Sequence, residues 1–125
     1  MQGRSLKSTK WMFVLVFVLT LSAVTSWAKD KTVLTPAAKA GEKVFQQNCA
    51  LCHNATSTSA KVGPGMKGLF KAKELPTSHK PVTVDNVRDQ IEKGNAAGKP
   101  LPMPPFASKL SKAQMNDLIE YLKTL

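Results

Sequence analysis

The chain has 125 residues, and its 18 Lys and Arg against 8 Asp and Glu give a net charge of +10. This length allows one small domain, and this charge favours an acidic protein partner or an anionic membrane face. A nucleic-acid partner is disfavoured, because past residue 28 the aromatic side chains are too few to form a stacking platform: they are Phe45, Phe70, Phe106 and Tyr121.

The N-terminal segment is typical of a secretory signal. Basic residues precede an apolar run over 11–21, and a small-residue cleavage site ends at Ala28. We therefore predict a signal peptide over 1–28 that exports the chain to a bacterial periplasm, and one domain over 29–125. The apolar run is short for a bilayer crossing. An uncleaved segment that anchors the chain to a membrane is the alternative.

The first helix is predicted over residues 36–48. Thr35 can cap its N-terminus, and Pro36 suits the first helical position because the N–H that it lacks would have no partner there. Mostly apolar or small residues recur on one face of this helix, namely Ala37, Ala40, Gly41, Val44, Phe45 and Asn48. We expect that face to be buried.

The motif Cys49-Ala50-Leu51-Cys52-His53 follows this helix and is the most informative stretch of the chain. It contains both of the 2 cysteines. They lie roughly one helical turn apart, so both sulfurs can face one porphyrin and add to its vinyl groups. His53 is then positioned to bind the iron. The spacing predicts one covalently attached c-type haem.

Three other uses of these thiols are weaker alternatives. A thioredoxin-like redox pair needs a neighbouring strand-helix-strand pattern, which the residues around Cys49 lack. A structural zinc site needs four ligands; only His53 and His79 are available besides the cysteines, and His53 lies too close to Cys52 to complete a tetrahedron comfortably. A disulfide between the two cysteines would close too short a loop to add much stability.

The segment from His53 to Thr83 has no long helical pattern, which is unusual in a compact domain. A haem accounts for it, since a large apolar disc can serve as the core against which a loop packs. The apolar side chains available for this packing are Val62, Met66, Leu69, Phe70 and Leu75. A short helix is expected within residues 67–73.

Two further helices are predicted. The one over residues 84–93 is capped by Thr83 or Asp85 and stopped by Gly94, and its apolar stripe consists of Val84, Val87 and Ile91.

The last helix is predicted over residues 112–124. It begins with the capping box Ser111-x-x-Gln114, and its apolar face carries Met115, Leu118, Ile119, Leu122 and Leu125. No clear strand pattern is present in the domain. The predicted fold class is therefore all-α.

Three stretches resemble the class I cytochrome c family: residues 41–53 (Gly-x-x-x-Phe-x-x-x-Cys-x-x-Cys-His), 63–70 (Gly-Pro-x-x-x-Gly-Leu-Phe) and 117–123 (Asp-Leu-Ile-Glu-Tyr-Leu-Lys). The resemblance covers essentially all of the chain past the signal. It implies a cytochrome c fold with three main helices around one covalently bound haem, in which the first and last helices cross. Gly41 would admit the backbone of the last helix, and Phe45 would pack on Tyr121.

The resemblance also implies that Met103 is the second axial ligand of the iron, opposite His53. Met103 lies in the proline-rich segment 100–106, where the family has its axial methionine. The prolines restrict the unfolded loop, and Pro104 biases Met103 toward an extended backbone, so that a weak thioether can be held on iron. The alternative is a stiff linker in which Met103 only packs.

Other ligand candidates are weaker. Met66 is expected to line the haem pocket, because the family usually has a leucine there, and Met115 is expected to face the core. His79 lies in a polar loop and is expected to be solvated, with bis-histidine ligation as an open alternative.

Further contacts are implied around the haem. The carbonyl of Pro64 is expected to accept a hydrogen bond from the ring of His53, which would orient the imidazole and raise its basicity. The pocket is expected to be lined by Met66, Leu69, Phe70 and Leu122.

Iron held by His53 and Met103 has no open position, so the expected chemistry is one-electron exchange. We predict a soluble or periplasmic electron carrier that is a monomer. Its expected partners are redox proteins with an acidic docking surface. Two alternatives use the same residues: an electron-accepting subunit of a periplasmic dehydrogenase complex, and a gas-binding or sensor haem protein whose Met103 leaves the iron. No catalytic base or phosphate loop is visible in the chain, so an independent enzyme is not expected.

Overall fold

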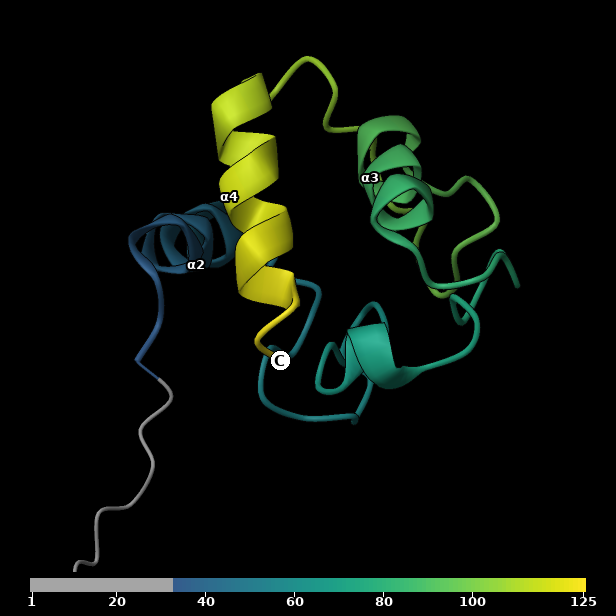
Figure 1. Ribbon diagram of the computed structural model, residues 1–125. Helices are drawn as coiled ribbons and strands as arrows, with labels where there is room; N and C mark the ends of the chain where they lie inside the picture. Colours follow the sequence, from purple (N-terminus) through teal and green to yellow (C-terminus); the bar gives the residue numbers. More distant parts are fainter. Residues whose placement is uncertain (1–32) are drawn as a thin grey trace, which may run out of the picture. The chain divides into compact units, whose positions relative to one another are not determined.

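The computed structural model describes residues 33–125, and helices account for its regular structure (Figure 1). In chain order these are α2 (Pro36–Asn48), the short 3-10 helix η1 (Leu69–Lys71), α3 (Val84–Lys93) and α4 (Lys112–Leu122). Strand-like pairing within this part of the chain is limited to isolated bridges. The predicted all-α class with three main helices is confirmed.

The predicted signal peptide, residues 1–28, lies outside the described residues. Within residues 33–125, no helix combines the length and the apolar character that a membrane crossing requires.

The helix N-termini are capped as the sequence predicts. The hydroxyl of Thr35 accepts a hydrogen bond from the backbone of Ala38 at 3.1 Å, and Thr83 does the same for α3. Ser111 and Gln114 form a reciprocal capping box, with bonds of 3.2 and 2.9 Å. Each bond satisfies a backbone group that has no partner within its helix, which fixes where the helix begins.

The end of α4 differs slightly from the sequence pattern. The helix stops at Leu122 instead of near Thr124, because the last residues form tighter turns. The N–H of Thr124 bonds to the carbonyl of Tyr121 at 2.9 Å, and its hydroxyl bonds to the same carbonyl at 2.7 Å. Fraying of this kind is common at the last turn.

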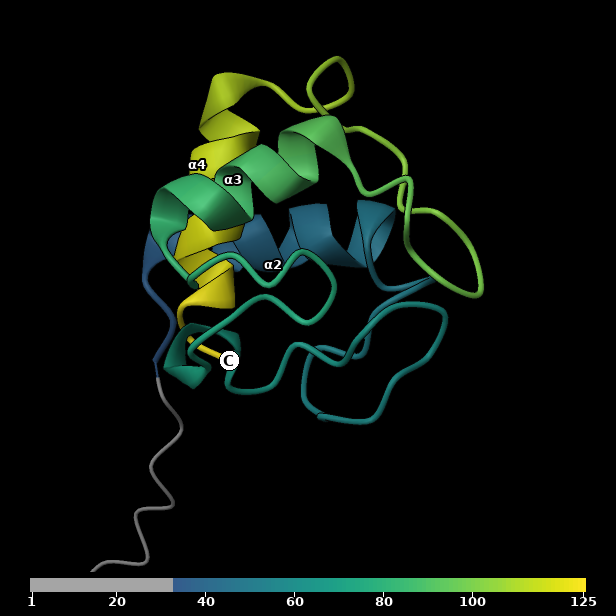
Figure 2. The same cartoon turned by 90° about the vertical axis from the view of Figure 1, so that its right-hand side faces the viewer.

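Helices α2 and α4 cross, and the two views show α4 passing over α2 at a steep angle (Figure 2). Gly41 lies at the crossing: a Cβ atom there would collide with the carbonyl of Asp117 and would lie 2.9 Å from the backbone nitrogen of Leu118. Beside it, the rings of Phe45 and Tyr121 meet edge to face, with centroids 5.6 Å apart. The predicted crossing is confirmed, since both backbones approach too closely for any side chain.

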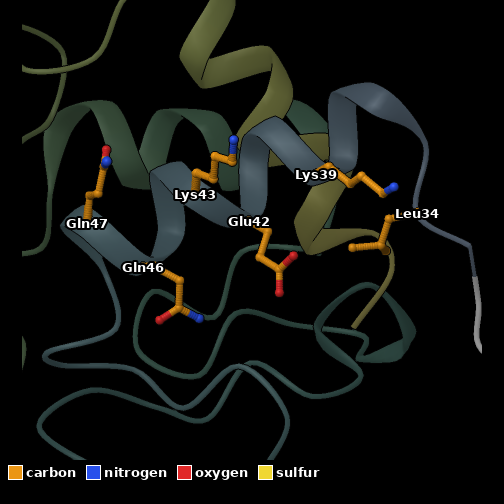
Figure 3. Close-up of a pocket in the computed structure, with 6 residues that line it drawn as sticks. All are labelled: Leu34, Lys39, Glu42, Lys43, Gln46 and Gln47. Carbon is orange, nitrogen blue, oxygen red and sulfur yellow. The ribbon is translucent and has the colours of Figure 1, made fainter.

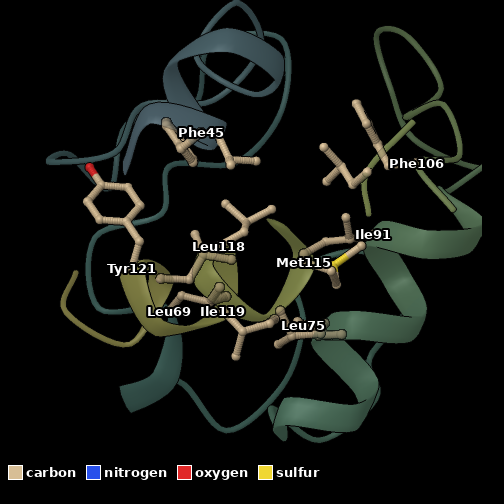
Figure 4. Close-up of a cluster of buried hydrophobic side chains, with 13 residues drawn as sticks. Phe45, Leu69, Leu75, Ile91, Phe106, Met115, Leu118, Ile119 and Tyr121 are labelled. Atoms are coloured by element: carbon tan, nitrogen blue, oxygen red, sulfur yellow. The ribbon is translucent and has the colours of Figure 1, made fainter. Parts of the chain in front are cut away.

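The hydrophobic core extends from this crossing to α3 (Figure 4). Met115 of α4 and Ile91 of α3 point toward one another, and Phe106 lies beside them. The core residues are Val44, Phe45, Leu69, Leu75, Val87, Ile91, Phe106, Leu110, Met115, Leu118, Ile119, Tyr121 and Leu122. Met115 is thus a core residue, as predicted.

The long connection between α2 and α3 is tied to the rest of the domain at a few points. It contains η1, inside the predicted range 67–73, and the N–H of Gly68 bonds to the carbonyl of Leu125 at 2.9 Å. Leu69 and Leu75 anchor it in the core. With so few anchors, this connection needs another surface to pack on.

We expect Gly41→Val to destabilise the domain by about 3 kcal/mol or more, because the backbones of α2 and α4 must separate to admit the side chain. The melting temperature should fall by roughly 10 °C or more.

Gln46→Val is the matched control. Gln46 projects from the outward face of α2, in a shallow depression that Lys39 and Lys43 also line (Figure 3). A valine there pays only the small helix penalty of a β-branched residue. Equal melting temperatures for the two variants would contradict a close crossing.

Candidate cofactor site

The domain contains a cavity of about 770 Å³. Residues of α2, α3 and α4 line it, together with residues of the α2–α3 and α3–α4 connections. Its volume falls within the usual range of ligand and cofactor pockets. The apolar residues that line it include Phe45, Leu69, Leu75, Val87, Ile91, Phe106, Leu118 and Leu122. It is therefore continuous with the core, and what fills it completes that core.

The motif at residues 49–53 forms a turn that continues from α2 into the cavity wall. The N–H of Cys49 bonds to the carbonyl of Phe45 at 2.8 Å, and the N–H groups of Cys52 and His53 bond to the carbonyl of Cys49 at 3.0 and 2.9 Å. Cys49, Cys52 and His53 all line the cavity. Helical geometry thus brings both sulfurs and the imidazole to one surface.

The Cys49 thiol is poorly suited to disulfide exchange. Both cysteines are free, and burial, with a smaller contribution from Cys52, raises the pKa of the Cys49 thiol to about 11. A thiol of this kind forms little of the thiolate that disulfide exchange requires. No group of three or more His, Cys, Asp or Glu side chains in residues 33–125 is placed to hold a metal ion.

The ring of His53 is held by the loop that follows it. Its Nδ1 lies 2.8 Å from the carbonyl oxygen of Pro64, and because a carbonyl only accepts, Nδ1 carries the proton. A Cβ atom on Gly63 would lie 2.8 Å from that nitrogen, so only glycine lets the loop pack against the ring. The expected bond to Pro64 is present, and it leaves Nε2 free as an electron-pair donor.

Backbone bonds bring that loop to the motif. The N–H groups of Val62 and Gly63 both bond to the carbonyl of Cys52, at 3.2 and 2.8 Å. Two donors on one acceptor fix the loop next to the motif, and the carbonyl of Pro64 follows directly. The sequence pattern Gly-Pro encodes this contact through backbone groups.

Met103 lines the same cavity from the loop between α3 and α4 and is half-buried. It pairs with Asn95 in a short antiparallel bridge, with N–H to carbonyl distances of 2.9 and 3.0 Å. Phe106, buried in the core, anchors the chain just after it. His53 and Met103, far apart in the sequence, therefore reach one cavity.

Most of the expected pocket residues line the cavity, namely Pro64, Met66, Leu69 and Leu122. The expectation for Phe70 needs a correction. Phe70 is not among the lining residues, and it packs, partly buried, against the hydrophobic core. Successive side chains of a 3-10 helix point about a third of a turn apart. Because Leu69 faces the cavity from η1, Phe70 is directed elsewhere.

His79 does not line the cavity. Its side chain is exposed, and Nδ1 lies 3.6 Å from the carboxylate of Glu74. Bis-histidine ligation through His79 is therefore not supported, and the expectation of a solvated histidine agrees with its position.

Some lining residues were not identified from the sequence. Two are large exposed apolar side chains, Leu51 and Leu101, which are 81% and 63% exposed. Three are lysines, Lys61, Lys99 and Lys109. Leu51 lies inside the cysteine motif, but nothing in the local pattern distinguishes these residues from ordinary surface.

A protein-family model, Cytochrome c, matches residues 38–125 of the chain. A search of curated proteins returned no match.

The cavity fits the haem c that members of this family carry. Cys49 and Cys52 have the spacing of its covalent attachment, and the imidazole and thioether donors of His53 and Met103 are those that bind haem iron. The apolar walls suit a porphyrin disc, and Gly63 makes a cradle for the imidazole that a Cβ atom would fill. Haem c is the cofactor of this protein.

We expect Gly63→Ala to displace the imidazole ring of His53, because the added methyl group and the ring cannot occupy the same space. The bond to Pro64 should lengthen or break, at a cost of about 1–3 kcal/mol in the haem-loaded protein. Proton NMR of the His53 ring and thermal melting would measure both effects.

Ser59→Ala, an exposed change in the same loop, is the control and should alter neither measurement. An unshifted His53 resonance in Gly63→Ala would contradict the tight packing of the ring.

Proposed function

Since this chain belongs to the cytochrome c family, we propose that it is an exported one-electron carrier of the bacterial periplasm, with His53 and Met103 as axial ligands of its haem iron. The coarser statement, a haem-based electron-transfer protein, follows from the family itself. The observation that carries the finer proposal is the convergence of His53 and Met103 on one cavity.

When bound, the haem supplies one-electron exchange between ferric and ferrous iron. His53 would bind through Nε2, because its Nδ1 is committed to Pro64 at 2.8 Å. That bond makes the imidazole a better donor. Met103 would contribute a soft sulfur, which favours ferrous iron and raises the reduction potential. Protein ligands on both sides would leave no position for oxygen or substrate.

Export and the periplasmic location rest on the N-terminal sequence. Basic residues, the apolar run over 11–21 and the small-residue site ending at Ala28 support a cleaved signal.

The mouth of the cavity has the composition of a docking surface. Leu51 and Leu101, both exposed, offer an apolar centre, and the lysines that line the cavity are Lys61, Lys99 and Lys109. The lining contains no Asp or Glu. An apolar centre with positive charge around it suits a transient complex with an acidic redox protein.

The distribution of charge along the chain strengthens this proposal. No acidic residue occurs between Glu42 and Glu74, or between Glu92 and Asp117, and these two stretches contribute both mouth leucines and all three mouth lysines. Elsewhere, Lys80 and Lys93 share the carboxylate of Asp89 as an ion-pair partner, and their hydrogen bonds hold the pKa of that carboxyl below its usual value.

Two of the mouth lysines have neutral neighbours instead. Lys61 donates to the carbonyl of Ala50 at 2.8 Å, and the ammonium of Lys109 lies 5.2 Å from the centre of the Phe106 ring. Neither contact cancels the charge. The field at the mouth therefore stays positive and can steer an acidic partner.

Met103→Ala tests the ligand assignment. We expect the ferric variant to lose its sulfur-to-iron charge-transfer band and the ferrous variant to bind carbon monoxide rapidly at neutral pH, because removal of the thioether opens a position on iron. Absorption spectra of the oxidised and reduced protein provide both measurements.

Met66→Leu is the matched control, since Met66 lines the same cavity from the loop that holds His53. It should keep the band and exclude carbon monoxide. If the unaltered protein binds carbon monoxide completely and at once, the carrier assignment fails and a gas-binding function takes its place.

A charge reversal at the mouth tests the docking surface. In the double variant with Lys99→Glu and Lys109→Glu, oxidation of the ferrous protein by ferricyanide should slow by about tenfold at low ionic strength. The difference should shrink as added salt screens the mouth. Stopped-flow kinetics over a salt series would measure it.

The double variant with Lys39→Glu and Lys43→Glu has the same change in net charge on the outward face of α2 (Figure 3). It should slow the reaction much less. Equal slowing in the two double variants would mean that only the net charge matters, which would contradict a local docking surface.

A further inference from the structure

Four backbone hydrogen bonds join the end of α3 to the segment around Met103. Asn95 and Met103 exchange two backbone hydrogen bonds, at 2.9 and 3.0 Å. Just beyond, the N–H of Phe106 bonds to the carbonyl of Ile91 at 3.0 Å, and that of Ala107 to the carbonyl of Glu92 at 3.2 Å. The last turn of α3 thus finds partners for its free carbonyls in the segment that carries Met103.

Gly94 lies at the centre of this junction. Its φ of 71° and ψ of −163° fall in a region that only glycine adopts without strain. A Cβ atom there would collide with the carbonyl oxygen of Met103 and would lie 2.7 Å from the carbonyl carbon of Pro104. The backbone of Gly94 therefore packs directly on the peptide that follows Met103.

A side chain of α3 holds Gly94 in turn. The amide of Gln90 donates to the carbonyl of Gly94 at 2.9 Å, and Gln90 also lines the cavity. Among residues 102–105, only Met103 has a backbone N–H, because its neighbours are prolines. That single donor bonds to Asn95, so the register of the whole segment depends on this junction.

We propose that Gly94 and Gln90 are positioning residues for Met103: they fix its backbone against the end of α3 and thereby hold its sulfur where it binds the iron. Neither residue touches the iron. The inference rests on the proposed ligation by His53 and Met103. It adds that residues at the C-terminal end of α3 determine how tightly the sulfur binds the iron.

The proposal predicts a specific defect. If the junction is displaced, the polypeptide around Met103 moves and the sulfur becomes easier to replace, while the haem stays attached through Cys49 and Cys52. Affinity of the ferric protein for added imidazole measures that replacement, because imidazole must compete with the sulfur for one position.

Gly94→Ala is the main test, in the haem-loaded protein. We expect imidazole to bind about tenfold more tightly than to the unaltered protein, with a weakened sulfur-to-iron band. Gly68→Ala is the control: Gly68 has a similar φ of 75°, but a Cβ atom there meets nothing within 4 Å. It should lower the melting temperature without changing imidazole affinity or the band.

Gln90→Ala is a milder second test that keeps the glycine and removes one hydrogen bond. It should raise imidazole affinity roughly threefold. Its control is Gln46→Ala, which removes the same type of side chain from the outward face of α2, away from the cavity, and should have no effect. If Gly94→Ala yields no haem-loaded protein, this second pair decides the question.

The outcomes separate this inference from the proposed function. If the unaltered protein lacks the sulfur-to-iron band, or Met103→Ala keeps it, the proposed ligation is wrong whatever happens at position 94. If Met103→Ala behaves as expected but Gly94→Ala matches Gly68→Ala, and Gln90→Ala matches Gln46→Ala, in imidazole affinity and spectrum, the positioning role is overturned.

Discussion

At Gly41 the backbone of α2 lies against the backbone of α4, with no room for a side chain between Gly41 and the carbonyl of Asp117. Glycine within a helix costs about 1 kcal/mol relative to alanine. Here the close approach offsets that cost, since it lets Phe45 reach Tyr121 and buries Leu118. The crossing fixes the direction in which α2 ends, and hence where Cys49 to His53 enter the cavity.

The two proposed iron ligands are held by different means. His53 follows the turn that continues from α2, and it is oriented by one hydrogen bond to Pro64 and one close backbone contact with Gly63. Met103 belongs to a loop without helical structure and depends on pairing with Asn95. The position of the Met103 sulfur therefore depends on the conformation of a loop more than the position of the His53 ring does.

Charge and apolar surface come together at the mouth of the cavity. The walls are apolar because they complete the core, while Leu51 and Leu101 carry that character out to solvent. The carboxylates of the domain lie mainly on α3 and α4, outside the two loop stretches that form the mouth. The apolar walls and the positive charge thus belong to different residues, so the acidic partner that we propose would not compete with the haem for the same side chains.

The sequence alone determined the helices, their caps and the cysteine motif, because helical periodicity and capping depend on residues within a few positions of each other. The resemblance of its motifs to the cytochrome c family also pointed to Gly41 and Pro64. Tertiary structure decided which faces meet. It directed Leu69 rather than Phe70 into the cavity, brought Leu51 and the lysines of a distant loop to the same cavity, and packed Gly94 against the peptide that follows Met103. These depend on contacts between segments far apart in the chain, and no local pattern records them.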